Sequence, residues 1–246
     1  MGKIAIIGGT GLTSLRGLEI IKREEIATPY GEPSSLLSYG ELHGKEIIFL
    51  ARHGDNHTVP PHKINYRANI WALKEAGVDR IIAMAAVGGI AKNFPPEKLA
   101  VPDQLIDYTW SRKNTFFEDD LNEVVHVDFT HPYDEKLRQA LIRACQDAGV
   151  EVCKSGVYGA TQGPRLETTA EIDRLERDGC TMVGMTGMPE AVLARELGLA
   201  YATCAVSVNW GAGRGEGEIT MNEIEASLKV GAQRVLAMLE RLVPML

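Results

Sequence analysis

The segment Ala-Arg-His-Gly-Asp-Asn-His at residues 51–57 carries side chains suited to binding an oxyanion. Arg52 offers a planar fork of N–H groups that matches a phosphate, and His53 adds a neighbouring imidazole. A second segment, Gly-Gly-Thr-Gly at residues 8–11, lets backbone N–H groups and the Thr10 hydroxyl converge on an anion. Each pattern has a plainer interpretation, an ion pair in solvent for the first and a tight turn for the second. Side by side, the two would form a phosphate-sized site.

Further polar or glycine-rich segments follow other predicted strands. Residues 85–89 read Ala-Ala-Val-Gly-Gly, residues 185–186 are Met-Thr, and residues 209–211 are Asn-Trp-Gly. Ligands of open α/β sheets bind at the carboxyl ends of the strands, so we expect these segments to line one site. Thr186 can act as a helix N-cap, as a phosphate ligand, or as both. Glu167 stands at the start of a predicted helix, where interaction with the helix dipole would by itself explain a carboxylate.

Short apolar segments alternate with helical patterns, which predicts an α/β fold with a largely parallel central sheet. No linker, repeat or low-complexity tract divides residues 1–246, so a single domain is expected. The polar and aromatic segment 109–132 has no periodicity and is expected to be a long functional or interface loop. The predicted strands are residues 3–8, 36–42, 46–51, 80–87, 101–108, 150–158, 180–184 and 199–208. The predicted helices are residues 64–77, 134–148, 168–177, 189–197 and 219–242.

The composition argues against several classes of function. The 246 residues include 26 Lys and Arg against 33 Asp and Glu, a net charge of −7, which disfavours binding to nucleic acid or to an anionic membrane. The longest apolar run, residues 81–87, is far shorter than the ~18 residues that a membrane span needs. The cysteines show no C-x-x-C spacing, so neither a metal site nor a redox motif is expected. Since no signal-peptide pattern is present, the sequence predicts a cytoplasmic protein.

Four ordered motifs together resemble the trimeric purine nucleoside phosphorylase and methylthioadenosine phosphorylase family. The motifs are GGTGL (8–12), ARHGDNHTVPPHKINYRANIWALKEAG (51–77), GPRLETTAEI (163–172) and VGMTGMPEAVLARELGL (183–199). The resemblance covers nearly the whole chain. It implies a mixed central sheet flanked by helices, a homotrimer, and purine salvage by reversible phosphorolysis of a nucleoside. It also implies that inorganic phosphate is a co-substrate and that no metal or organic cofactor takes part.

The family's binding residues are carried over by position in the motifs. The resemblance implies that Met185 packs against the sugar, while Glu167, Asn209, Trp210 and Gly211 contact the nucleoside, with Glu167 and Asn209 as the catalytic pair. It also implies that His57 and the loop with His126 and His131 reach a neighbouring subunit's pocket. The expected phosphate-binding residues are Thr10, Arg52, His53, Ala85, Ala86 and Thr186.

The pair Glu167 and Asn209 predicts which purine is bound. A 6-oxopurine presents N1–H as a donor and O6 as an acceptor, whereas a 6-aminopurine reverses both. A carboxylate at Glu167 can only accept, which suits N1–H, and the amide of Asn209 can donate to O6 or N7. Adenine-specific family members carry Asp at the position of Asn209 and Ser at that of Glu167. The sequence therefore predicts a 6-oxopurine base.

Near the start of the last helix, inosine-cleaving family members place a His that contacts the sugar 5′-hydroxyl. Met221 stands there in this chain, and its thioether suits an apolar 5′-methylthio group. If the register slips by one residue, Asn222 takes that position. The two predictions combined give S-methyl-5′-thioinosine as the substrate, with hypoxanthine and 5-methylthioribose 1-phosphate as products. The chain is similar to bacterial S-methyl-5′-thioinosine phosphorylases, and methylthioadenosine and inosine or guanosine phosphorylases are the alternatives.

Two interpretations lie outside this class of enzyme. A dinucleotide-dependent reductase could use the loop 8–11, but the third glycine of its fingerprint is replaced by Ser14. A non-catalytic nucleoside-binding module would be expected to lack the phosphate donors, yet Thr10, Arg52, His53 and Thr186 are all present.

Overall fold

The long strand β5 (Val78–Gly89) is the branch point of the central sheet in the computed structural model, which describes residues 2–9, 17–119 and 121–246. On one edge, β5 pairs in parallel with β1 (Lys3–Gly8), and the far edge of β1 pairs in parallel with β4 (Lys45–Ala51). β3 (Leu37–Leu42) and β2 (Glu19–Glu24) then continue the sheet antiparallel. This half of the sheet carries the segments 8–11 and 51–57 at its strand ends.

The other half of the sheet divides at the end of β5. The pairing of β5 with β1 ends at Ala83, and its antiparallel pairing with β10 (Met182–Gly184) begins at Gly88. β11 (Ala200–Trp210) runs in parallel along the opposite edge of β5. This change of partners opens a crevice beside residues 84–87. In the sheet, β10 pairs with β9 (Val157–Ala160), and β9 pairs with β7 (Gln104–Asp107). On the other branch, β11 pairs with β6 (Leu99–Ala100), and β6 pairs with β8 (Val152–Cys153).

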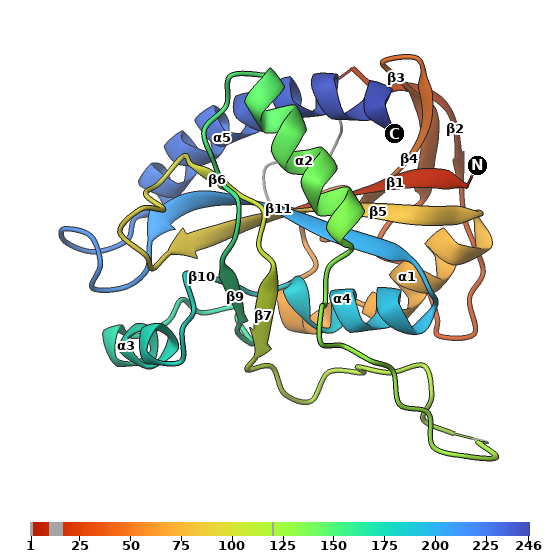
Figure 1. Ribbon diagram of the computed structural model, residues 1–246. Coiled ribbons are helices and arrows are strands. Elements are labelled where there is room, and N and C mark those ends of the chain that lie inside the picture. Colours follow the sequence, from red (N-terminus) through yellow and green to blue (C-terminus); the bar gives the residue numbers. More distant parts are fainter. Residues whose placement is uncertain (1, 10–16, 120) are drawn as a thin grey trace.

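Helices cover both faces of the sheet (Figure 1). α1 (Tyr66–Glu75) and α4 (Gly187–Glu196) pack on the face formed by residues such as Ile7 and Ile81. α2 (Glu135–Asp147) and α5 (Met221–Leu242) pack on the opposite face, which is formed by residues such as Ile6 and Ile82. α3 (Thr169–Arg177) packs through Ile172 and Leu175 against Val183 of β10, and the 3₁₀ turns are Pro61–Lys63 and Val243–Met245. Since side chains of a strand point alternately to opposite faces, each strand supplies both cores.

The polar residue that precedes four of these helices explains where each begins. The side chains of Asn65, Asp134, Thr168 and Thr220 accept hydrogen bonds from backbone N–H groups in the first turn of α1, α2, α3 and α5. Such caps satisfy N–H groups that have no partner within the helix. The predicted helices therefore start within one or two residues of their observed positions.

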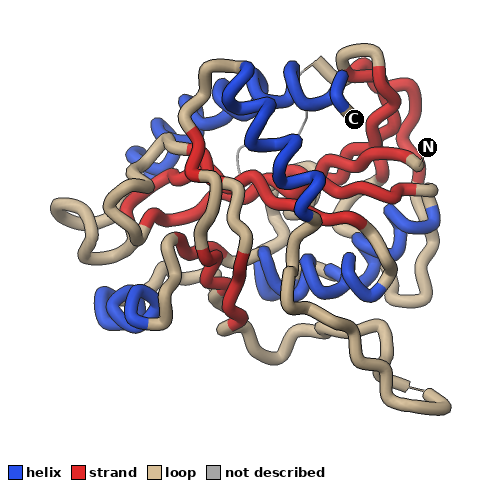
Figure 2. The backbone as a smooth tube through the Cα atoms, viewed as in Figure 1, coloured by secondary structure: helices blue, strands red, loops and turns tan. Residues whose placement is uncertain are grey.

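The expectation of an α/β fold with a mixed central sheet flanked by helices is confirmed. The predicted strand 101–108 is shortened to β7, with β6 ending just before it at Ala100, and the predicted strand 150–158 is divided into β8 and β9. Pro102, which has no N–H group, lies between β6 and β7, and Gly156, at φ 156°, lies between β8 and β9. The mostly exposed β2 was not predicted, because its sequence EIIKRE lacks alternation. Within 109–132 the described residues form neither helix nor strand, as expected (Figure 2).

None of the helices in the described ranges has the length and apolar character required to cross a membrane.

Candidate active site

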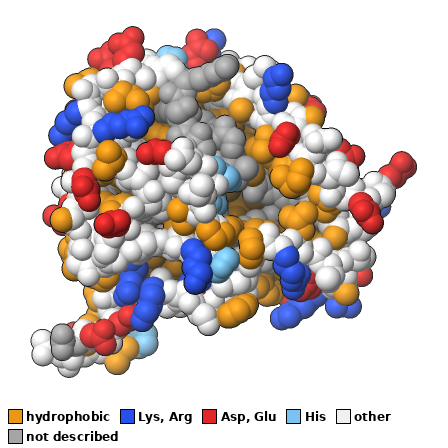
Figure 3. All heavy atoms as spheres, turned by 180° about the vertical axis from the view of Figure 1, so that it is seen from behind, with side chains coloured by type: hydrophobic (Ala, Val, Ile, Leu, Met, Phe, Trp, Pro, Cys, Tyr) orange, Lys and Arg blue, Asp and Glu red, His pale blue; other side chains and the backbone are white. Residues whose placement is uncertain are grey.

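A cavity of about 160 Å³ lies in the crevice where β5 changes partners. The face seen from behind is hollowed, with histidine side chains near the hollow (Figure 3). The cavity brings together residues from the ends of β4, β5, β10 and β11, which is where an open α/β sheet binds ligands. Eight predicted site residues line it: Arg52, His53, Ala85, Ala86, Glu167, Met185, Thr186 and Asn209.

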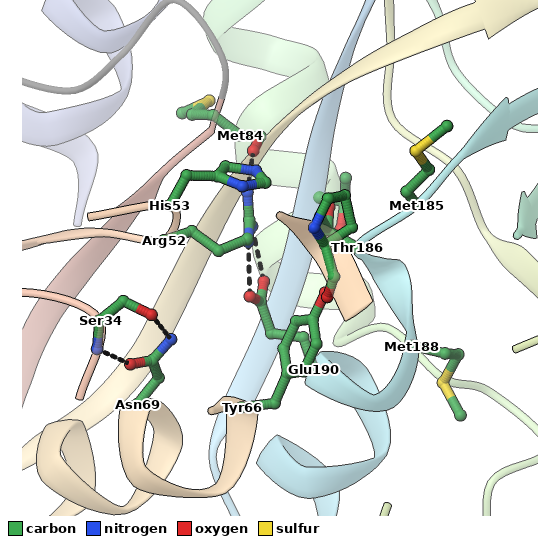
Figure 4. A network of polar contacts seen from close by, with 12 residues as sticks. Ser34, Arg52, His53, Tyr66, Asn69, Met84, Met185, Thr186, Met188 and Glu190 are labelled. Carbon is green, nitrogen blue, oxygen red and sulfur yellow. Dashed lines mark hydrogen bonds and ion pairs between the residues drawn. The ribbon is translucent and has the colours of Figure 1, made fainter. Parts of the chain in front are cut away.

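Arg52 is fully buried at the base of the cavity and is held by Glu190 (Figure 4). Its Nε and Nη2 donate to the two carboxylate oxygens of Glu190 at 2.6 and 2.7 Å, and its Nη1 donates to the Met84 carbonyl at 2.8 Å. A guanidinium has five N–H groups, so one N–H on each terminal nitrogen is left for a ligand. Burial acts to lower the pKa of Arg52, but the adjacent carboxylate outweighs it and raises that pKa. Arg52 therefore stays charged and fixed in orientation.

Glu190 is a site residue that the sequence analysis missed. Its side chain is 0% exposed, and it also accepts a hydrogen bond of 2.8 Å from the hydroxyl of Tyr201, which lies in β11. The motif that contains Glu190 was recognised, but only as the start of a helix. A sequence signal was present, because a carboxylate inside the otherwise apolar start of α4 needs a buried partner.

His53 is neutral and offers a hydrogen-bond acceptor to a ligand in the cavity. Its Nδ1 lies 2.8 Å from the carbonyl oxygen of Val59, so Nδ1 carries the proton and Nε2 carries the lone pair. Burial, followed by the charge of Arg52, lowers the pKa of His53 to about 4. The ring of His57 packs beside it, with ring centroids 4.6 Å apart. His53 can thus accept a hydrogen bond from a protonated phosphate oxygen or from a hydroxyl group.

Thr186 immediately precedes α4 and is 7% exposed. Its side chain does not cap the helix, and its backbone N–H donates to the Tyr158 hydroxyl at 3.3 Å. Of the two roles considered for Thr186, the N-cap role is thus wrong. The hydroxyl is left to meet a ligand in the cavity that Thr186 lines.

Glu167 also lines the cavity, from the segment between β9 and α3. One of its carboxylate oxygens accepts a hydrogen bond of 2.6 Å from the Thr161 hydroxyl. Burial raises the pKa of Glu167, and the Thr161 hydrogen bond opposes this increase. Glu167 precedes Thr168, the N-cap residue of α3, so it lies outside the helix that it was expected to begin.

A β-bulge orients Asn209. Ser207 lies opposite Val87 and Asn209 opposite Gly88, so Val208 is the extra residue in β11. The Asn209 amide donates to the Trp210 carbonyl at 2.7 Å. A Cβ atom at Gly88 would lie only 3.3 Å from Asn209 Nδ2, so a larger residue there would crowd the Asn209 amide.

Comparison with known proteins places this arrangement in a family. The model of the phosphorylase superfamily matches residues 3–244. The chain belongs to the phosphorylase superfamily. It is 56% identical to a probable S-methyl-5′-thioinosine phosphorylase of Pseudomonas syringae, with 96% of both chains covered. It is 42% identical to a 6-oxopurine nucleoside phosphorylase of Pyrococcus furiosus, with 100% of this chain and 94% of the relative covered.

Solved structures of the superfamily share the fold closely. A methylthioadenosine phosphorylase from Schistosoma mansoni in complex with adenine has a TM-score of 0.95 at 30% identity, covering 100% of this chain and 92% of that one. The resemblance to the nucleoside phosphorylase family is therefore confirmed, and this phosphorylase is an enzyme of the glycosyltransferase type. The reductase and binding-module interpretations are set aside on the same evidence.

Four of the predicted site residues of the phosphorylase are not among those lining the cavity. Thr10 lies outside the described residues. Trp210 and Gly211 line a second cavity, which shares Asn209 with the first. Met221 is 65% exposed at the start of α5, and the residue of this helix that lines the site is Ile224, which is 8% exposed. The described residues contain no group of three or more His, Cys, Asp or Glu arranged to hold a metal ion.

Proposed function

We propose that this phosphorylase cleaves S-methyl-5′-thioinosine with inorganic phosphate, giving hypoxanthine and 5-methylthioribose 1-phosphate. The observation that carries the proposal is that Glu167 and Asn209 line the same cavity as Arg52, His53 and Thr186. The free oxygen of Glu167 accepts N1–H of the 6-oxopurine, and the Asn209 amide donates to O6 or N7. The name of the Pseudomonas syringae relative supports this choice of substrate.

In the proposed complex, the phosphate binds beside Arg52. The two N–H groups that Glu190 and Met84 leave free donate to phosphate oxygens, and the Thr186 hydroxyl adds a third donor. His53 accepts from a protonated phosphate oxygen through Nε2, since its Nδ1 is used by Val59. The backbone at Ala85 and Ala86, together with Thr10, completes the proposed phosphate site.

In the proposed mechanism, one set of residues binds the base and another set binds the phosphate. As the bond between C1′ and N9 lengthens, negative charge develops on the purine and positive charge on the ribose ring. Asn209 and Glu167 stabilise the departing base, which is an electrostatic contribution. Phosphate attacks C1′ from the other side, and its own charge stabilises the oxocarbenium-like transition state. The reaction needs no metal or organic cofactor.

The 5′ end of the sugar is expected to meet an apolar surface. Ile224, together with Val208, lines the cavity, and neither side chain can hydrogen-bond a 5′-hydroxyl. A methylthio group buries apolar area there, whereas a hydroxyl would be left without a partner. This surface supports methylthioinosine over the alternative of an inosine or guanosine substrate.

The proposal extends to assembly and location. Residues 117–119 and 121–127 lie on a loop that projects away from the body of the protein (Figure 1), and Leu121, Val124 and Val125 on it are exposed. In a homotrimer, this segment, with His126 and His131, would reach the neighbouring subunit. Light scattering that gives the mass of one chain would contradict this arrangement. Four free cysteines support a reducing, cytoplasmic location.

Product analysis tests the reaction itself. With phosphate present, incubation with methylthioinosine should release hypoxanthine and an equal amount of 5-methylthioribose 1-phosphate. Without phosphate, neither product should form. Formation of free methylthioribose at the same rate in both mixtures would identify a hydrolase and contradict the proposal.

A further inference from the structure

Arg112 joins two segments that flank the active-site cavity, here called its walls: the 161–162 loop, whose Thr161 contacts Glu167, and the 185–188 turn, whose Met185 and Thr186 line the cavity. It lies in the loop that follows β7, and its guanidinium contacts the loop after β9 and the turn after β10. Nη1 donates to the carbonyls of Met185 at 2.8 Å and Met188 at 2.6 Å. Nη2 donates to the carbonyls of Thr161 at 3.2 Å and Gln162 at 2.8 Å, and Nε donates to the Gln162 side chain at 3.1 Å.

Each of these walls carries groups that the proposed reaction uses. On one side, the hydroxyl of Thr161 donates to the Glu167 carboxylate. On the other, Met185 lines the cavity and Thr186 follows it. The walls also meet directly, because the Thr161 N–H donates to the Gly184 carbonyl at 2.8 Å. Arg112 thus reinforces this direct contact and holds the 161–162 loop, which supports Glu167, against the turn that carries Met185 and Thr186.

We propose that Arg112 is a positioning residue for phosphorolysis, which holds the 161–162 loop and the 185–188 turn at the separation that the transition state requires. This role rests on the proposed function, because it assigns Glu167 and Thr186 to the two reactants. A displacement of ~1 Å in a reacting group can cost about 100-fold in rate. Arginine suits the task because its planar fork directs donors to both walls at once, whereas the single nitrogen of lysine cannot.

The same loop has a second anchor, which provides a matched control. Glu196 accepts hydrogen bonds of 2.7 Å from the Thr115 hydroxyl and from the Phe116 N–H. Neither partner lines the cavity or hydrogen-bonds to the 161–162 loop or the 185–188 turn. Glu196→Gln therefore loosens the loop without touching the walls that Arg112 joins.

The test compares Arg112→Ala with Glu196→Gln by melting temperature, kcat, and KM for nucleoside and phosphate. For Arg112→Ala, kcat should fall about 100-fold. Millimolar guanidinium should restore part of the loss by occupying the vacated site. Glu196→Gln should keep kcat within about threefold of the parent, even if its melting temperature falls by as much as that of Arg112→Ala. Arg112 has only a structural role if its Ala variant keeps the parental kcat, or if guanidinium restores nothing to a folded variant.

Arg112→Lys keeps the proposal testable should the Ala variant fail to fold. It should melt close to the parent and lose about tenfold or more in kcat, and a parental kcat would overturn the proposal. Activities are measured with whichever nucleoside the parent cleaves best. A parent that cleaves no nucleoside refutes the proposed function, whereas an active parent with an unaffected Arg112 variant refutes only the role of Arg112.

Discussion

Glu190 binds Arg52 through two parallel hydrogen bonds of 2.6 and 2.7 Å, with both side chains almost completely removed from solvent. The carboxylate fixes the plane of the guanidinium and directs its two remaining N–H groups. The carboxylate offsets part of the cost of burying the arginine charge. A phosphate that enters the cavity therefore meets donors that are already oriented.

Removing one member of this pair should destabilise the protein more than removing both. Arg52→Met leaves the Glu190 carboxylate buried without its main partner, which should cost about 3–5 kcal/mol in the free energy of unfolding. The double variant Arg52→Met, Glu190→Met replaces both charges by apolar groups and should recover most of that loss. Both variants should lack phosphorolysis. Urea unfolding and activity assays check this, and a single variant as stable as the parent would show that the pair is not buried as described.

Asn209→Asp should shift the base preference toward 6-aminopurines. The Asp carboxylate can accept from an exocyclic amino group but cannot donate to O6. The ratio of kcat/KM for methylthioinosine over methylthioadenosine should fall by roughly ten- to a hundredfold, because mispaired buried groups cost about 1–3 kcal/mol. Asn122→Asp, at an exposed position, makes the same change in net charge and serves as the control. An unchanged ratio in Asn209→Asp would count against the base assignment.

Substitutions at Ile224 and Met221 should differ in their effect on the preference between a 5′-methylthio group and a 5′-hydroxyl. Ile224→Thr should lower the preference for methylthioinosine over inosine by about tenfold, because a hydroxyl replaces part of an apolar wall. Met221→Ala should leave the ratio unchanged, since Met221 is 65% exposed. Competition between the two nucleosides measures both ratios. The reverse result would mean that the start of α5 moves into the cavity when substrate binds.

The stability of the protein should fall on acidification partly because of His53. The pKa of His53 is lowered to about 4 by burial and by Arg52, while the unfolded chain titrates near 6.5. Between these values the unfolded state binds more protons, so the stabilising contribution is complete above about pH 6.5 and disappears toward pH 4. At most about 3 kcal/mol depends on this group. The difference in unfolding free energy between the parent and His53→Gln should narrow from pH 7.5 to pH 5, and a constant difference would refute the pKa.

The segments that form the site could be predicted from sequence because they follow strands. Arg52, Ala85, Thr186 and Asn209 each lie at or just after the carboxyl end of a predicted strand, and one sheet brings such ends together. Glycine and polar residues at those points mark the ends clearly. The caps at Thr168 and the other helix starts were likewise local and therefore predictable.

The residues that position the site were not predictable in the same way. Arg112 binds backbone carbonyls, which any sequence supplies, from loops about 50 and 75 residues away. The choice between Met221 and Ile224 depends on the rotation of α5 about its axis, which packing against β11 determines. The bulge at Val208 leaves no sequence pattern, yet it sets the direction of Asn209.

The most direct test of the account measures phosphate-dependent release of base from methylthioinosine, methylthioadenosine and inosine, compared by kcat/KM at equal concentrations. We expect kcat/KM for methylthioinosine to exceed that of both other nucleosides by at least about tenfold, or roughly 1.4 kcal/mol in transition-state binding. A lead for methylthioadenosine would contradict the roles of Glu167 and Asn209. A lead for inosine would contradict the apolar 5′ surface formed by Ile224.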